Sequence, residues 1–223
     1  MINAAIFDMD GTFLDSMPYW MNAGENFLES LQIQAEENLG EKLLDMTLQD
    51  GCIYLKEKYS LNLSPEQIEE KIKDILLSAY SEKIQFKEGA MAFLEKLKKT
   101  GAKIAVCTHT DRSLFSPAFK RLGLENFFDY VISAKEFGLS KSHPEIFFHV
   151  AEKLNSKPEE TWIFEDALYA IITAKKAGFK TAGIFDTSSK KDEEKIKKIV
   201  TKYFYNYSQA EAFFFQDKKE FLK

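Results

Sequence analysis

Short apolar runs alternate with amphipathic segments along most of the chain. The runs that have the length of buried strands lie at 4–7, 103–107, 130–133, 161–164 and 180–184. After residue 89 the intervening segments have helical spacing, and several end at a glycine, such as Gly101, Gly123 and Gly178. Strands that alternate with helices predict an α/β fold, a Rossmann-like parallel sheet with helices on both faces.

Residues 16–86 have a different pattern. Leucine and glutamate recur at helical spacing, and no strand-like run occurs. Ser64 is followed by Pro65 and Gln67, which predicts a helix start with a serine cap and a glutamine capping-box partner. The run 4–7 precedes this segment, whereas the other strands follow it. We therefore predict a core domain of residues 1–15 and 87–223, interrupted by an all-helical insertion at 16–86.

Composition narrows the class of protein. The chain has 223 residues, 45% of them hydrophobic, and a formal charge of −5, which argues against a broadly basic surface for nucleic acid. No apolar run approaches the ~18 residues of a membrane span. Cys52 and Cys107 lie outside any C-x-x-C pattern, so no disulfide framework or zinc site is expected. We expect a cytoplasmic protein, a monomer or weak homodimer, with an aromatic tail beyond Asp186 that covers a face of the core.

Polar residues follow the predicted strands at the edge of the sheet where ligands usually bind. They are Asp8 and Asp10 after the first strand, Thr108 after the second, and Glu165 and Asp166 after the fourth, with Lys141 in a loop. Carboxylates gathered at one edge repel one another unless a cation lies between them, and oxygen ligands suit Mg²⁺. Lys141 could offer positive charge, and Thr108 a hydroxyl and neighbouring N–H groups, to phosphate oxygens.

The segment after the first strand could divide catalytic work between two acids. Asp8 and Asp10 are two residues apart, so they point the same way on an extended chain. One carboxylate can then attack as a nucleophile while the other carries protons. Gly11 permits a turn, and Thr12 can hold the turn and the nucleophile by hydrogen bonds.

The motifs, in this order, resemble those of the haloacid dehalogenase-like (HAD) superfamily. The similar branch contains phosphatases and β-phosphoglucomutases with a helical C1 cap inserted after the first strand. The resemblance covers nearly the whole chain. It is carried by Phe7-Asp8-Met9-Asp10-Gly11-Thr12, Asp15-Ser16, Val106-Cys107-Thr108, Ser140-Lys141-Ser142-His143-Pro144-Glu145-Ile146-Phe147 and Ile163-Phe164-Glu165-Asp166.

This resemblance implies a Mg²⁺-dependent phosphoric monoester hydrolase that acts on a small phosphorylated metabolite, and a role for each matching residue. Asp8 would take the phosphoryl group as an aspartyl-phosphate, and Asp10 would act as general acid and base. Metal ligands would be Asp8, the backbone carbonyl of Asp10 and Asp166, supported by Thr12 and Glu165. Phosphate would be bound by Thr108, Lys141 and the backbone N–H of His109. Residues 16–86 would be the cap domain, with Tyr19 and Trp20 as candidate substrate contacts.

The sequence departs from the family pattern in two places. Serines flank the lysine, at Ser140 and Ser142, where the family often has Gly-Lys-Pro-x-Pro. A less rigid loop is therefore expected around Lys141. Ala167 and Ala170 stand where the family usually has serine and glycine, which affects the hydrogen bonding behind the metal ligands.

The resemblance also leaves other activities of the same scaffold open. A sugar phosphomutase of the β-phosphoglucomutase type carries a cap histidine twelve residues past the nucleophile, but Trp20 occupies this position and the first histidine is His109. A dehalogenase needs no second acid, so Asp10 argues against it. A non-catalytic, partner-binding relative would be expected to lack one of the residues described above, and none is lost.

Overall fold

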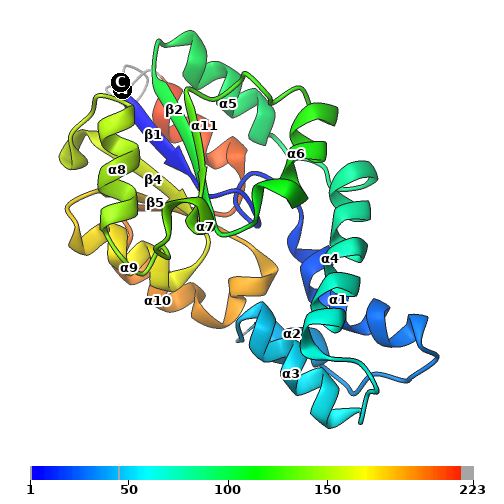
Figure 1. The fold of residues 1–223 in the computed structure, drawn as a ribbon. Coiled ribbons are helices and arrows are strands. Elements are labelled where there is room, and N and C mark those ends of the chain that lie inside the picture. The colour runs from blue at the N-terminus through cyan, green and yellow to red at the C-terminus, as the bar shows by residue number, and fades with distance from the viewer. Residues whose placement is uncertain (1, 45, 217–223) are drawn as a thin grey trace. The chain divides into compact units, whose positions relative to one another are not determined.

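The computed structural model describes residues 2–44 and 46–216 of the chain (Figure 1). Contacts divide the chain into two compact units. The α/β unit consists of Met1–Asp15, Phe86–Arg112 and Leu124–Lys223. The helical unit consists of Ser16–Gln85 and Ser113–Gly123.

A parallel sheet forms the centre of the α/β unit. Its strands are β1 (Ala4–Phe7), β2 (Lys103–Thr108), β3 (Tyr130–Ser133), β4 (Thr161–Glu165), β5 (Lys180–Ile184) and β6 (Lys202–Phe204). Their order is β3-β2-β1-β4-β5-β6, so the N-terminal strand lies in the middle of the sheet. The predicted Rossmann-like α/β class is confirmed. The sheet has one strand more than expected, because the edge strand β6 was not foreseen.

Alternate side chains of the strands pack on opposite faces of the sheet. Ile6 and Ile163 share one hydrophobic cluster with residues of α8 (Glu145–Lys153) and α9 (Leu168–Lys176). On the other face, Phe7 contacts Phe93 of α5 (Ala90–Lys99), and Phe164 contacts Phe214 of α11 (Tyr207–Phe215). The aromatic tail thus covers a face of the core, as predicted. The remaining helices of this unit are α7 (Ala134–Phe137), η1 (Pro158–Glu160), η2 (Thr187–Asp192) and α10 (Glu193–Ile199).

The helical unit contains α1 (Met17–Ser30), α2 (Leu39–Leu44), α3 (Leu48–Lys58) and α4 (Pro65–Glu82). Helix α1 packs against α2 and α4, and α3 packs against α4 (Figure 1). The predicted capping box is present at the start of α4: Gln67 N–H donates to Ser64 Oγ, and Ser64 N–H donates to Gln67 Oε1. No strand occurs in residues 16–44 and 46–85.

Helix α6 (Arg112–Arg121) crosses the boundary between the units. Residues 113–123, which the sequence assigns to the core, group by their contacts with residues 16–85. One reason is that the Arg121 guanidinium donates to the carbonyls of Tyr80, near the end of α4, and of Ile84, which follows α4. Conversely, Phe86 groups with the α/β unit, because it bridges Leu14.

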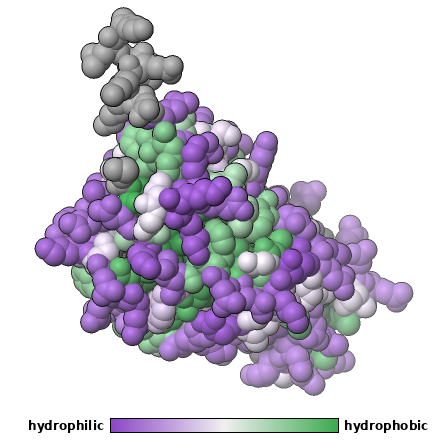
Figure 2. Space-filling view, turned by 90° about the horizontal axis from the view of Figure 1, so that it is seen from above, coloured by the Kyte–Doolittle hydropathy of each residue, from purple (hydrophilic) through white to green (hydrophobic). Residues whose placement is uncertain are grey.

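The face of the molecule in Figure 2 is largely hydrophilic, and both cysteines are free thiols. Hydrophilic side chains cover much of the face seen in Figure 2, with hydrophobic patches between them. Among the residues that the structure describes, no helix combines the length and the apolar character that a membrane crossing requires. Cys52 and Cys107 are buried free thiols, as expected.

Candidate active site

The order of the strands brings the predicted site residues to one edge of the sheet. Strand β1 lies between β2 and β4, so the residues that end these strands are neighbours. Asp8 directly follows β1, and its N–H donates to the Phe164 carbonyl over 2.9 Å. Thr108 is the last residue of β2, and Glu165 is the last residue of β4. The site therefore lies at the carboxyl ends of the strands, where parallel sheets bind ligands.

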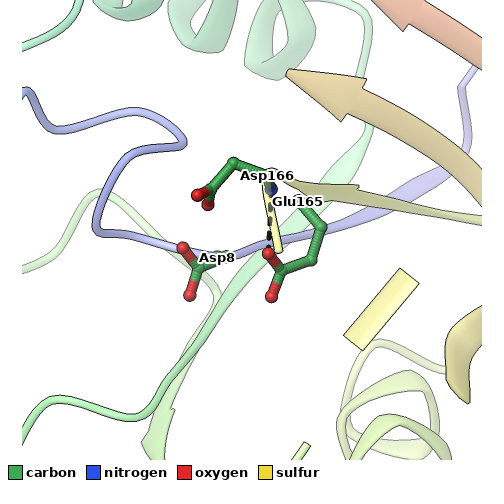
Figure 3. A group of neighbouring side chains, drawn as sticks. All are labelled: Asp8, Glu165 and Asp166. Atoms are coloured by element: carbon green, nitrogen blue, oxygen red, sulfur yellow. Dashed lines mark hydrogen bonds between the residues drawn. The ribbon is translucent and has the colours of Figure 1, made fainter. Parts of the chain in front are cut away.

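Asp8, Glu165 and Asp166 form a buried carboxylate cluster (Figure 3). One oxygen atom from each lies within 4.8 Å of the others. Burial raises the pKa of Asp166 well above its usual value, and the negative charges of Glu165, Asp8 and Asp186 add to this effect. A bound cation would relieve this repulsion, so the cluster has the electrostatic character of a metal site.

Lys141 is buried against the same cluster. Its Nζ donates to Asp8 Oδ1 over 2.5 Å and also to Glu165 Oε1. Burial alone would lower the pKa of the Lys141 ammonium, but the carboxylates of Asp8 and Glu165 outweigh this effect and raise it. Lys141 therefore stays charged beside the predicted nucleophile, as a phosphate-binding lysine must.

Both carboxylate oxygens of Glu165 accept hydrogen bonds. Its Oε1 accepts from Lys141, while its Oε2 accepts from the N–H groups of Asp166 and Ala167 over 2.8 and 2.9 Å. Burial raises the pKa of Glu165 to about 7, although Lys141 acts in the opposite direction. Because its Oε1 faces an ammonium and its Oε2 already accepts from two backbone N–H groups, Glu165 is better suited to orient Lys141 than to bind a metal directly.

Asp8 and Asp166 are better placed to hold a metal ion. Thr12 Oγ1 lies 3.2 Å from Asp8 Oδ2 and 3.0 Å from Asp166 Oδ1, and its single proton can serve one of them at a time. Ser189 Oγ donates to Asp166 Oδ2 over 3.0 Å. Asp8 Oδ2 and both oxygens of Asp166 face neutral hydroxyls, which compete with a cation less strongly than the Lys141 ammonium does at Asp8 Oδ1. The donor set is chemically suited to a hard cation such as Mg²⁺.

Asp10 faces the threonines that follow β2. Thr110 Oγ1 donates to Asp10 Oδ2 over 2.7 Å, while Thr108 Oγ1 lies at 3.5 Å from the same atom. Thr110 N–H donates to Thr108 Oγ1 over 3.1 Å, which fixes the hydroxyl of Thr108. Thr110 was not among the predicted site residues, although it stands two residues after Thr108 in the same loop.

The turn after Asp10 is held by residues that the sequence did not single out. Lys87 Nζ donates to the Gly11 carbonyl over 2.7 Å, and Tyr207 Oη donates to the Thr12 carbonyl over 3.0 Å. The backbone N–H of Lys87 donates to the Phe13 carbonyl over 2.9 Å. Three consecutive carbonyls are thus bound by two residues from distant parts of the chain.

The Lys87 ammonium has two further acceptors. It donates to the Phe185 carbonyl over 2.7 Å and to Asp186 Oδ2 over 2.6 Å. Lys87 therefore joins the turn after Asp10 to the loop after β5. No local motif marks Lys87 or Tyr207, and only the tertiary fold reveals their positions.

Tyr19 and Trp20 lie on α1 of the helical unit. Trp20 Nε1 donates to Tyr80 Oη over 3.0 Å. Tyr19 lines a groove of about 380 Å³ in the same unit, together with Asp74 and Lys83. Their role as substrate contacts stays a prediction.

Comparison with known proteins identifies the family. The sequence profile of the haloacid dehalogenase-like hydrolases matches residues 5–184. The chain belongs to this family. The match extends from β1 through β5 and includes Asp8, Asp10, Glu165 and Asp166.

Curated relatives of this HAD-like hydrolase include proteins named as phosphatases and pyrophosphatases. The chain is 29% identical over 179 residues to the phosphorylated carbohydrates phosphatase of Thermotoga maritima, covering 80% of this chain and 83% of that protein. It is 28% identical over 192 residues to the pyrophosphatase PpaX of Bacillus mycoides, covering 82% and 83%. The crystal structure of a putative β-phosphoglucomutase from Thermotoga maritima is similar, with 26% identity, a TM-score of 0.78, and coverage of 91% and 94% of the two chains.

Proposed function

We propose that this HAD-like hydrolase is a Mg²⁺-dependent phosphatase that cleaves small phosphorylated metabolites through an aspartyl-phosphate. The observation that carries the proposal is the position of Asp8 between the Lys141 ammonium and the Asp166 carboxylate. One neighbour suits a phosphate oxygen and the other suits a cation. The phosphatase names of the curated relatives support the same reaction class.

The proposed reaction has two half-reactions. In the first, an Asp8 oxygen forms a bond to phosphorus, the bond from phosphorus to the ester oxygen breaks, and Asp10 gives its proton to the departing alcohol. In the second, Asp10 takes a proton from water, whose oxygen attacks phosphorus and releases Asp8 and inorganic phosphate. Lys141 and Thr108 bind the phosphoryl oxygens, on which negative charge is spread in the transition state.

Asp8, Asp166 and the backbone carbonyl of Asp10 are the proposed ligands of Mg²⁺. When bound, the metal would neutralise negative charge on the phosphoryl group and on the carboxylates. Glu165 supports the site through Lys141 and through the N–H groups of Asp166 and Ala167. Thr12 and Ser189 orient the Asp166 carboxylate.

We propose phosphorylated carbohydrates as the substrate class, because a relative with 29% identity is named for them. The helical unit would act as the cap that selects the substrate and excludes water, with Tyr19 and Trp20 among its candidate contacts. The mutase alternative is not favoured. Trp20 stands where such mutases carry a histidine, and its Nε1 is bound to Tyr80. The proposed partners are small molecules, and a cytoplasmic monomer or weak homodimer stays our expectation.

A substrate panel tests the proposal. Phosphate release should be measured with Mg²⁺ on hexose phosphates, hexitol phosphates, nucleotides, phosphorylated small acids and inorganic pyrophosphate. We expect the fastest turnover on a sugar or sugar-alcohol phosphate. Pyrophosphate as the best substrate would overturn the carbohydrate assignment. Glucose 6-phosphate formed from glucose 1-phosphate faster than phosphate is released would favour the mutase.

Variants of the two acids test the chemistry. Asp8→Asn should lower kcat by at least about 10³-fold, because the nucleophile is lost. Asp10→Asn should lower it by roughly 10²- to 10⁴-fold, because proton transfer is lost. Asp50→Asn in the helical unit is the matched control and should have wild-type turnover. An Asp8→Asn protein with full activity would sink the assignment.

A further inference from the structure

The imidazole of His109 joins three segments of the α/β unit. It follows β2, and its Nε2 accepts a hydrogen bond from the backbone N–H of Lys141 over 3.1 Å. Its Nδ1 lies 2.7 Å from Tyr169 Oη in the first turn of α9, and the two rings stack with centroids 5.8 Å apart. One side chain thus connects the loop of Thr108, the loop of Lys141 and the helix that follows Asp166.

The hydrogen bonds assign the tautomer of this ring. A backbone N–H can only donate, so Nε2 must be unprotonated. A neutral imidazole then carries its proton on Nδ1, and His109 donates to Tyr169 Oη. Partial loss of solvation and the nearby Lys141 ammonium lower the pKa of His109 to about 4, which agrees with a neutral ring.

Within the loop that His109 holds, hydrogen bonds join neighbouring residues. Ser142 N–H donates to Ser140 Oγ over 3.3 Å, and His143 N–H donates to the Ser140 carbonyl over 3.0 Å. These bonds shape the turn but do not tie it to the rest of the fold. The ammonium of Lys141 is anchored by Asp8 and Glu165, whereas its backbone N–H is anchored by His109. His109 therefore fixes the main-chain end of the lysine.

The contact of His109 with the Lys141 loop can compensate for the residues in which this loop departs from the family pattern. Serines replace the glycine and the first proline of the family's loop, although Pro144 is kept, and Tyr169 lies in the segment where Ala167 and Ala170 also depart from the family. A loop that is less rigid by its own composition needs an external contact to keep a long side chain in place.

We propose that His109 and Tyr169 are positioning residues that hold the Lys141 loop for phosphoryl transfer, an inference that rests on the proposed phosphatase function. His109 acts through the backbone of Lys141, and Tyr169 acts by orienting His109. Neither group is required to touch the reacting atoms.

Three variants separate the parts of this contact. His109→Leu removes both hydrogen bonds and should lower kcat/KM for p-nitrophenyl phosphate by about 10- to 100-fold. Tyr169→Phe keeps the ring and removes only the acceptor for Nδ1–H, so a loss of about fivefold is expected. His109→Gln can accept from Lys141 N–H and donate to Tyr169, and should restore kcat/KM to within about threefold of the wild type.

A second Tyr–His pair of the α/β unit supplies matched controls. Tyr130 Oη lies 3.0 Å from His149 Nε2, away from the carboxylate cluster. Tyr130→Phe and His149→Leu make the same chemical changes and should leave kcat/KM at the wild-type value. If the loss of a Tyr–His contact merely reduced the amount of folded protein, kcat/KM would fall in the variants of both pairs. A positioning effect would lower kcat/KM only in the variants of His109 and Tyr169.

Amide hydrogen exchange gives a readout that does not depend on activity. The Lys141 backbone N–H, followed by NMR in the full-length protein, should exchange faster in His109→Leu than in His149→Leu. A wild-type protein that hydrolyses no phosphate ester would refute the proposed function while leaving this exchange test intact. The positioning role is overturned if an active wild type is matched by His109→Leu and Tyr169→Phe, or if the Lys141 amide is equally protected in both leucine variants.

Discussion

Replacing Lys87 by methionine should destabilise the α/β unit strongly. Lys87 Nζ lies 2.6 Å from Asp186 Oδ2, and the two side chains are 17% and 4% exposed. Removing one partner of a buried ion pair costs about 3–5 kcal/mol, because the other charge is left without compensation. Since Lys87 retains some contact with water, the lower end of about 3 kcal/mol is expected.

An exposed ion pair of similar length provides the control. Lys195 Nζ lies 2.7 Å from Asp192 Oδ1, but these side chains are 69% and 23% exposed. Lys195→Met should therefore cost less than about 1 kcal/mol. Comparing the two lysines separates the effect of burial from the effect of distance, because both are replaced by the same residue.

Urea unfolding measures the difference. The chain has two tryptophans, one in each unit, so a Trp20→Phe background leaves Trp162 as the fluorescent reporter of the α/β unit. With a slope of about 3 kcal/mol per M, Lys87→Met should lower the midpoint by about 1 M. Adding Asp186→Asn should recover part of this loss, because the uncompensated charge is removed. If Lys87→Met and Lys195→Met have the same midpoint, the reasoning from burial is refuted.

Further changes test other contacts. Tyr207→Phe leaves the Thr12 carbonyl without its donor and should lower the free energy of unfolding by about 1–2 kcal/mol in the same urea assay; an unchanged midpoint would contradict this. Gly40→Ala would place a Cβ 2.3 Å from the Met21 carbonyl oxygen and should lower Tm by about 2–6 °C, whereas Gly51→Ala, whose nearest atom is a leucine methyl at 3.3 Å, should not lower it in a thermal scan. Chelation should abolish phosphate release and added Mg²⁺ should restore it; activity that survives exhaustive chelation would exclude a metal requirement.

The sheet and the centre of the site could be predicted from local patterns. Strands β1 to β5 end within one residue of their predicted bounds, because each apolar run is bounded by a clear turn signal. The convergence of Asp8, Lys141 and Asp166 follows from the rule that parallel strands end at one edge. Strand β6 has three residues and one neighbouring strand, so its apolar pattern is too short to be recognised.

The supporting residues could not be predicted in this way. Lys87 and Tyr207 act on the turn after Asp10 through contacts that span 76 and 195 residues of sequence. Taken alone, a lysine near an exposed linker resembles a solvated side chain, and a tyrosine in an aromatic tail resembles ordinary core. The family resemblance implies a role only for the backbone N–H of His109, whereas the contacts of its ring depend on Tyr169, sixty residues away.

The central position of β1 has a consequence for synthesis on the ribosome. This strand is made first, but its partners β2 and β4 begin at Lys103 and Thr161. At about 5–20 residues per second, β1 waits roughly 10 to 30 s until both neighbours have been made. During this time its apolar residues lack their sheet, while the helical segment 16–85 can already fold locally. Nascent chains stalled before β4 should therefore contain a folded helical segment and a β1 segment that chaperones can bind.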